Sequence, residues 1–479
     1  MLSDVTTPQD LDDRFREALA GLAAAPRRRD PAERVHDGAP LTGAQLLDLF
    51  DAQVTSRQLD LAGRWLRSFG EGFYTIGSAG HEGNAAVAAA LRPDDPALLH
   101  YRSGAFYCLR AAQAAGEVAS PGPEGETDAP TPEAAPVSPE AEPARPEAEE
   151  TPPEAGTPAE AEAGAEAGTG GEAADGTADD PAAGRDGAAG RADAYAGAAR
   201  DVLRGMVASA REPIAGGRHK VFGRADLAIV PTTSTIASHL PRAVGAGLAL
   251  ERLRRRDPAG RRAGADPLGD VGQPPRSPWP PDAIVVCSFG DASVNHASAT
   301  AAFNTAGWYD HTGLRIPVLF VCEDNGLGIS VRSPKGWVEA TLRSKPGIRY
   351  FSADGTDPVQ AYEAAVEAAG WVRRHRRPAV LHLSTVRLMG HAGADAEAAY
   401  RSSGEIAADL DRDPLLATAR LLVAAGVATA DELLARYDER GWQVRRIAEE
   451  VLGEPKHPYA AEVDAETAPR RPDRVARAV

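Results

Sequence analysis

The sequence predicts an α/β fold in which a parallel sheet is flanked by helices. Apolar stretches typical of buried strands at residues 283–289, 316–322 and 378–386 alternate with stretches of helical spacing. Such alternation is the signature of βαβ units, whose parallel strands are buried on both faces. The chain has 479 residues, which is long enough to bury a substantial core.

The elements before the first of these strands are predicted in chain order. Residues 1–40 look like a polar arm with a short helix, and apolar spacing behind Thr42 predicts one long amphipathic helix. A glycine-bearing turn then precedes an alanine-rich helix and a short apolar run that ends at Tyr101 and Arg102. Residues 227–256 are predicted to form a strand, a polar loop and a helix whose last residues are basic, as the helix dipole favours.

Two stretches of biased composition interrupt this pattern. Residues 115–197 are dominated by Ala, Glu, Pro, Gly, Asp and Thr, and we expect a long, disordered acidic insertion in a surface loop. Residues 254–281, rich in Pro, Gly and Arg, are expected to form a shorter solvated loop. The expected organisation is a polar arm at 1–40, a main domain at 41–455 with both insertions, and a flexible tail at 456–479.

Charge and cysteine usage exclude some classes of function. A net charge of −17 and a pI near 5.2 argue against binding to nucleic acid or to an anionic membrane. The beginning of the chain lacks a signal-like pattern and no stretch reaches the roughly 18 apolar residues of a membrane span, so we expect a soluble cytoplasmic protein. Cys108, Cys287 and Cys322 lie among apolar neighbours without CxxC spacing, and reduced buried thiols are expected.

Two oxygen-bearing side chains follow neighbouring predicted strands. Asp291 follows the first strand and Asn325 the second, and Gly290 permits close backbone approach. Open α/β sheets bind ligands at the carboxyl ends of their strands, and Mg²⁺ prefers oxygen ligands that it shares with phosphates. Each residue alone is more often a turn residue. Together they predict a metal-bridged diphosphate site.

Two further residues are candidates for contact with an anion. Arg102 stands at the end of an apolar run, where a guanidinium can form paired bonds to diphosphate oxygens, although by itself it reads as a solvated surface arginine. His391 lies in a Gly- and Ala-rich loop after the last strand. It is either merely exposed or suited to phosphate contact or proton transfer.

The two motifs and four further stretches resemble a known family. Gly290-Asp291-Ala292 and Asp324-Asn325 resemble the thiamine diphosphate signature, a Gly-Asp-Gly about thirty residues before Asn-Asn. From about residue 73 to 452, outside the insertions, the chain is similar to the α subunit of the E1 component of 2-oxoacid dehydrogenase complexes, the branched-chain and pyruvate group. The stretches that carry the resemblance are FYTIGSAGHEGN, HYRSGAF, STIASHLPRAVGAGLA, GDASVNHASATAAFN, VCEDNGLGIS and TVRLMGHAGADAEAAYR.

The resemblance implies a thiamine diphosphate-binding fold, with thiamine diphosphate and Mg²⁺ as cofactors. It implies that Asp291, Asn325 and the backbone carbonyl of Leu327 bind the metal. It also implies that His391 belongs to a mobile loop, contacts the cofactor phosphate and supports catalysis. The remaining implied cofactor-binding residues are Tyr101 and Arg102 at the diphosphate, Ser234 and Ile236 beside the aminopyrimidine, and Gly290, Ala292 and Asn295 in the first motif.

The chain departs from the family pattern at three places. Ala292 replaces the second glycine, Asp324 replaces the first asparagine, and the spacer between the motifs is about five residues longer, around WYDHTGLRI. These changes are expected to affect fine positioning more than metal binding. Ala392 stands where many eukaryotic members carry a phosphorylatable serine, so regulation through that site is not expected.

The activity implied by the resemblance is oxidative decarboxylation of a 2-oxo acid with acyl transfer to the lipoyl group of an E2 acyltransferase. In this family the glutamate that activates the aminopyrimidine belongs to the β subunit, and this chain has no second half that could supply it. The expected assembly is therefore an α₂β₂ heterotetramer, and the chain alone should be inactive. The tail also leaves open a relative in which the α and β halves are fused.

The substrate and the exact activity stay open. FYTIGSAGHEG and SHLPRAVGAG look closer to the 2-oxoisovalerate branch, whereas Glu323 is more like the pyruvate branch. The alternatives are a pyruvate dehydrogenase, another thiamine diphosphate enzyme of split α/β arrangement, such as an acetoin dehydrogenase or the N-terminal half of a transketolase-like synthase, or a non-catalytic paralogue. In that paralogue Ala292 and Asp324 mark a decayed site and the acidic tract serves as an interaction arm.

Overall fold

The computed structural model describes residues 7–73, 75–119, 193–212, 214, 222–256 and 278–459. They belong to one compact unit, which spans residues 1–126 and 192–479. A second unit, residues 127–191, lies outside the described residues, as does most of the predicted insertion at 115–197. Residues 257–277 of the second predicted insertion and residues 460–479 of the predicted tail lie outside them too.

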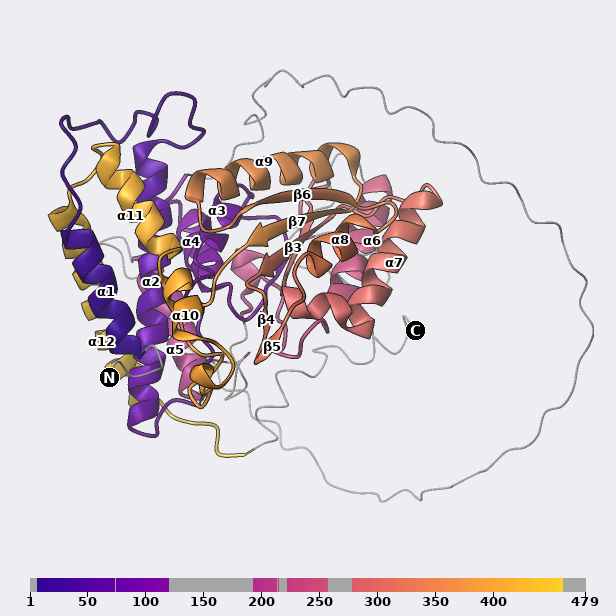
Figure 1. Ribbon diagram of the computed structural model, residues 1–479. Coiled ribbons are helices and arrows are strands. Elements are labelled where there is room, and N and C mark those ends of the chain that lie inside the picture. The colour runs from indigo at the N-terminus through magenta and orange to yellow at the C-terminus, as the bar shows by residue number, and fades with distance from the viewer. Residues whose placement is uncertain are drawn as a thin grey trace, which may run out of the picture. The chain divides into compact units, whose positions relative to one another are not determined.

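A five-stranded parallel sheet forms the centre of the described unit (Figure 1). The strands stand in the order β1 (Ala97–Leu98), β2 (Val285–Gly290), β3 (Val318–Asp324), β7 (Ala379–Ser384) and β6 (Arg349–Asp354). The three predicted strands are confirmed as β2, β3 and β7, with ends that differ by one or two residues. Pairing of Gly290 with Glu323 and of Asp324 with Ser384 brings the carboxyl ends of β2, β3 and β7 to one edge.

The side chains along each strand point alternately into two apolar layers, one on each face of the sheet. Ile284, Val286, Leu319 and Val321 point toward the layer of α3 (Asn84–Ala89), α4 (Gly104–Ala114) and α9 (Pro358–His375). Val285, Cys287, Phe320 and Cys322 point toward the layer of α6 (Leu240–Arg256), α7 (Ala297–His311) and α8 (Trp337–Arg343). This burial on both faces explains why the strands read as continuous apolar runs. All three cysteines are free and buried, as predicted.

A helical layer beside the sheet is built around α2 (Gly43–Ser68), which begins at the predicted Thr42 through a capping box with Gln45. Its neighbours are α4, α5 (Ala194–Met206), α11 (Pro414–Ala424) and α12 (Ala430–Leu452). The helix α1 (Pro8–Ala20) packs in turn on α11 and α12. The prediction of an amphipathic α2 is wrong in one respect. Ser56, Arg57 and Asp60 are buried because helices cover the expected polar face as well.

Three boundaries differ from the prediction. Residues 1–40 are not a separate polar arm, because α1 buries Leu11, Phe15 and Leu19 against the unit. The helix α6 ends at Arg256, as its basic last residues predicted, and so includes the first three residues of the insertion predicted from residue 254. The helix α5 begins at Ala194, inside the first predicted insertion, because the Asp193 carboxylate accepts hydrogen bonds from the amides of Tyr195 and Ala196.

The strand predicted near residue 229 is also wrong. Ile229 makes only isolated bridges, to Ala97 and to Arg224, after the short helix η1 (Ala225–Leu227). Pro231 has no amide hydrogen with which to extend a ladder.

Shorter elements connect these layers near the sheet edge. They are η2 (Asp291–Asn295), the antiparallel pair of β4 (Leu327–Gly328) and β5 (Val331–Arg332), η3 (Glu397–Ala399) and α10 (Ser403–Leu410). None of the helices in the described ranges has the length and apolar character needed to cross a membrane.

Candidate functional site

The two sequence motifs meet at the carboxyl edge of the sheet. Asp291 directly follows β2 and is 2% exposed, and its Oδ2 accepts a hydrogen bond from Ser333 Oγ. Asn325 follows β3, and its Oδ1 accepts a hydrogen bond from the Leu327 amide at 3.0 Å. The strand β4, which contains Leu327, packs on η2, which begins at Asp291. The structure therefore brings the three predicted metal ligands to one place.

The electrostatics of Asp291 suit a cation. Burial, and secondly the nearby Asp324 carboxylate, raise the pKa of Asp291 to about 6. Among the described residues, no basic side chain pairs with the Asp291 carboxylate. A buried carboxylate is costly unless a partner compensates its charge. A carboxylate, an amide oxygen and a backbone carbonyl are ligands that Mg²⁺ accepts, so the residues fit such an ion.

Two of the three departures from the family pattern, Ala292 and Asp324, have a local explanation. Gly328 of β4 faces Ala292, and a Cβ on Gly328 would lie only 2.7 Å from the Ala292 Cβ. The missing side chain at Gly328 thus makes room for Ala292. Asp324 accepts a hydrogen bond from the Gly326 amide at 2.9 Å through Oδ1 and contacts His382 Nε2 at 2.9 Å through Oδ2. Oδ1 therefore holds the turn after β3, and Oδ2 joins the end of β3 to β7.

A basic group lies at the same edge. Arg102 is 3% exposed, donates one hydrogen bond to the Gly77 carbonyl and lies 3.0 Å from His391 Nδ1 through its Nη2. The His391 ring meets the Tyr101 ring edge-on at a centroid distance of 6.2 Å. The structure therefore brings together the three residues predicted for the diphosphate.

The protonation state of His391 follows from this environment. Burial, followed by the charges of Arg102 and Arg387, lowers the pKa of His391 to about 4. The ring is consequently neutral near pH 7, and because Arg102 can only donate, His391 Nδ1 accepts. The two buried guanidinium groups make this part of the edge suitable for an anion.

Buried polar residues of α2 hold the turn that carries Gly77. The Asp60 carboxylate accepts hydrogen bonds from the amides of Ser78 and Ala79 at 2.5 and 2.7 Å. Arg57 joins Glu82 at 2.6 Å and Asp413 at 2.9 Å, all three being buried. The sequence did not reveal the role of these residues, because charged residues in a helical pattern are normally taken to lie on the face of the helix that is exposed to solvent.

Three residues predicted to bind the cofactor, Ser234, Ile236 and Asn295, are less closely connected to the predicted metal ligands. Ser234 and Ile236 lie in the loop before α6, and Ile236 is 43% exposed. This loop is fixed beside the sheet edge, since Thr232 Oγ1 donates to the Leu99 carbonyl at 3.1 Å. Within the described part of the chain, neither Ser234 nor Ile236 forms a hydrogen bond with Asp291. Asn295 uses its side-chain oxygen to accept a hydrogen bond from Trp337 Nε1 at 2.7 Å.

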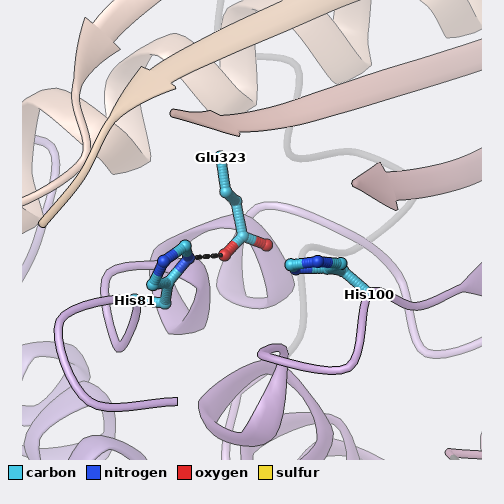
Figure 2. A group of neighbouring side chains, drawn as sticks. All are labelled: His81, His100 and Glu323. Carbon is cyan, nitrogen blue, oxygen red and sulfur yellow. Dashed lines mark hydrogen bonds and ion pairs between the residues drawn. The ribbon is translucent and has the colours of Figure 1, made fainter. Parts of the chain in front are cut away.

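The structure also shows a buried group that the sequence did not reveal. His81, His100 and Glu323 converge behind the two motifs (Figure 2), and their potential ligand atoms lie within 4.8 Å of one another. His81 Nδ1 lies 2.7 Å from Glu323 Oε2. His81 and Glu323 are 242 positions apart in the sequence, and only the position of Glu323 beside the second motif could have drawn attention to it.

Hard oxygen donors and buried arginines lie at the carboxyl edge of a parallel sheet, an arrangement whose chemistry suits a phosphate group and a divalent cation. The family described as "Dehydrogenase E1 component" matches residues 193–459, more than half of the chain. The chain belongs to this family, and the predicted resemblance to a 2-oxoacid dehydrogenase E1 α subunit is confirmed.

Three relatives show how far the similarity extends. The chain is 26% identical over 274 residues to the 2-oxoisovalerate dehydrogenase subunit alpha of Bacillus subtilis, a match that covers 56% of this chain and 72% of that protein. It is 27% identical over 175 residues to the mitochondrial pyruvate dehydrogenase E1 component subunit alpha of Dictyostelium discoideum, covering 36% and 45%. It is 34% identical over 156 residues to the corresponding subunit of Zymomonas mobilis, covering 32% and 42%. The chain thus spans less than half the length of the latter two.

Proposed function

We propose that this chain is the α subunit of a 2-oxoisovalerate dehydrogenase-type E1 enzyme. It works with an E1 β subunit in an α₂β₂ assembly, uses thiamine diphosphate and Mg²⁺, and delivers the acyl group to the lipoyl group of E2. The observation that carries the proposal is the meeting of Asp291, Asn325 and Leu327 at the sheet edge that also holds Arg102 and His391.

The residues divide between the two parts of the proposed cofactor. Asp291, Asn325 and the Leu327 carbonyl would hold Mg²⁺, while Tyr101, Arg102 and His391 would face the diphosphate. Thiamine diphosphate, when bound, supplies the nucleophilic carbon and the electron sink that decarboxylation of a 2-oxo acid needs.

The chain itself contributes orientation and hydrogen bonding. Because His391 Nδ1 accepts from Arg102, the proton of the neutral ring is on Nε2, which can donate a hydrogen bond to an anionic oxygen. The His391 amide donates to Asp395 Oδ2 at 2.6 Å, which fixes the start of this loop. Arg387 donates to the Ile329 carbonyl at 2.7 Å and so joins the β4–β5 turn to the residues before His391.

Of the three relatives described above, the one matched over 274 residues supports a branched-chain substrate, since it is named a 2-oxoisovalerate dehydrogenase subunit. A pyruvate-specific enzyme is the second candidate, because the relative with 34% identity is named a pyruvate dehydrogenase subunit. The two substrates differ in the bulk of the group attached to the 2-oxo carbon. Their relative rates therefore assign the substrate directly.

The test is to purify the chain with and without its β subunit and to measure reduction of an artificial electron acceptor by each 2-oxo acid, with thiamine diphosphate and Mg²⁺. We expect activity only in the mixture, faster with 2-oxoisovalerate and lost in Asp291→Ala. The exposed Asp411→Ala serves as the control that keeps wild-type activity. Faster turnover of pyruvate would assign the second candidate, and an inactive but fully assembled mixture would contradict both.

A further inference from the structure

A chain of hydrogen bonds runs from the interior of the sheet to the proposed metal ligand Asn325. Glu323 is 1% exposed near the end of β3, and its Oε2 lies 2.7 Å from His81 Nδ1. The other nitrogen of the same ring, His81 Nε2, lies 2.8 Å from Asn325 Nδ2. The His81 side chain is completely buried, so no solvent molecule competes for either nitrogen.

The direction of each hydrogen bond follows from the groups involved. Glu323 receives donors on both oxygens, since Asn84 Nδ2 lies 3.3 Å from Oε2 and Ser103 Oγ lies 3.4 Å from Oε1. It therefore acts as an acceptor toward His81, which places the imidazole proton on Nδ1. His81 Nε2 is then an acceptor, and the group of Asn325 that faces it must be the NH₂ donor.

This arrangement fixes the orientation of the Asn325 carboxamide. With Nδ2 directed toward His81, Oδ1 lies on the opposite side, where it accepts from the Leu327 amide at 3.0 Å. A carbonyl-type oxygen has two lone pairs, so the second one stays available to a cation. If the amide were reversed, an NH₂ group would occupy the ligand position.

We propose that Glu323 and His81 are positioning residues that orient Asn325 so that its Oδ1 is presented to the divalent cation. This inference rests on the proposed function, because it concerns the Mg²⁺ of that site. Partners that orient a metal ligand from behind are known to affect metal affinity strongly. Here the orienting partners come from β3 and from the turn after residue 80, which the buried Arg57 and Asp60 hold in place.

A metal ion bound by His81, His100 and Glu323 themselves is the competing interpretation of the same group (Figure 2). Both nitrogens of His81 already have hydrogen-bond partners, which makes an ion unnecessary there. His100 Nδ1 has no partner, but its ring packs on Tyr101 at a centroid distance of 3.9 Å and lies against Gly290. Packing therefore accounts for the position of His100.

The first test measures Mg²⁺ binding to the assembled α and β subunits by calorimetry at saturating thiamine diphosphate. His81→Phe removes both hydrogen bonds and is expected to weaken Mg²⁺ binding by about 10- to 100-fold. His81→Gln can donate to Glu323 and accept from Asn325, and it should recover most of that loss. His239→Phe is the matched control, because His239 is also buried but contacts the Ser288 carbonyl at 2.7 Å instead of Asn325.

The second test does not need the cofactor. With histidines labelled by ¹⁵N, the imidazole of His81 should show the Nδ1–H tautomer in the assembled protein, even if His81→Phe does not fold. Three results would overturn the inference. The first is an Nε2–H tautomer of His81, and the second is an unchanged Mg²⁺ affinity in His81→Phe. The third is one bound zinc per chain that is lost in Glu323→Gln. A wild-type assembly that binds no Mg²⁺ in the presence of thiamine diphosphate would instead contradict the proposed function. In that case the tautomer of His81 would still test the chain of hydrogen bonds.

Discussion

At the scale of single residues, the site consists of polar groups that are buried and individually held. Asp291 and Asn325 could be predicted because each follows a recognisable strand and their residue types suit one ion. His81 could not be predicted as their neighbour, because its partner Glu323 lies 242 positions away in sequence. Arg57 and Asp60 were missed for another reason, since the burial of a charged residue inside a helix depends on what packs over it.

The buried pairs of Arg57 with Glu82 and Asp413 should be important for stability. Arg57→Leu leaves two carboxylates buried without a cation, and we expect a loss of about 3–5 kcal/mol in the free energy of unfolding. Urea denaturation measures this loss. The exposed pair of Arg14 and Asp411 is the control, and Arg14→Leu should cost at most about 1 kcal/mol. Equal losses in both variants would contradict the interpretation.

The lowered pKa of His391 predicts a dependence of stability on pH. Its folded-state pKa of about 4 lies below the ordinary value of 6.5, so the unfolded chain binds more protons between these values. Stability therefore falls as the pH falls through this range. The melting temperature of both proteins should fall between pH 7 and pH 5. The fall should be roughly 1–3 °C smaller for His391→Gln, whose side chain cannot be protonated, than for the wild type.

The charged groups around His391 are Arg102, Arg387, Arg64 and Asp395, and all four stay unchanged in His391→Gln. Differential scanning calorimetry at the two pH values measures the effect. Melting temperatures that shift in parallel for the two proteins would show that His391 does not cause it.

At the scale of secondary-structure elements, the sequence predicted those strands and helix ends that depend on neighbouring residues alone. The strands β2, β3 and β7 and the start of α2 at Thr42 were identified because apolar runs and a capping box are local signals. The failed strand near Ile229 and the buried polar face of α2 depend on packing between distant segments. The β4–β5 pair was not identified because two-residue strands carry almost no pattern. The six-residue β6 was not identified either, because only Phe351 of it is buried and it lacks a continuous apolar run.

The contact between β4 and η2 leads to a prediction about element packing. Gly328→Ala places a Cβ about 2.7 Å from that of Ala292, and the resulting overlap should cost about 1–3 kcal/mol of stability. It should also weaken Mg²⁺ binding, because Leu327 would move with the strand. The double variant Ala292→Gly with Gly328→Ala restores the space, so its unfolding free energy should return most of the way. A double variant that is no more stable than Gly328→Ala would contradict this packing.

At the scale of the whole molecule, the two ends that flank the long acidic stretch approach each other. The Glu117 carboxylate accepts hydrogen bonds from the Ala194 amide at 3.2 and 3.1 Å, and α4 packs on α5. A short connection can therefore replace residues 121–191. Replacing them with about eight Gly and Ser residues should raise the free energy of unfolding by roughly 1–2 kcal/mol, because a shorter loop loses less entropy on closure.

Urea denaturation of the shortened and the complete protein tests this expectation. A loss of more than about 1 kcal/mol would show that the removed residues stabilise the fold beyond their effect on loop closure. Binding of the β subunit should be the same for both proteins. Loss of that binding would favour the alternative in which the acidic tract is an interaction arm.

The most direct test of the proposed function is the binding of thiamine diphosphate to the assembled α and β subunits with and without Mg²⁺, for the wild type and Asp291→Asn. Asp291 is buried, and no basic side chain of the described structure compensates the charge of its carboxylate. We predict tight binding that requires Mg²⁺ in the wild type and that is weakened by about 100-fold or more in Asp291→Asn. Equal binding by both proteins, or binding that does not depend on Mg²⁺, would contradict the assignment of this edge as the metal-diphosphate site.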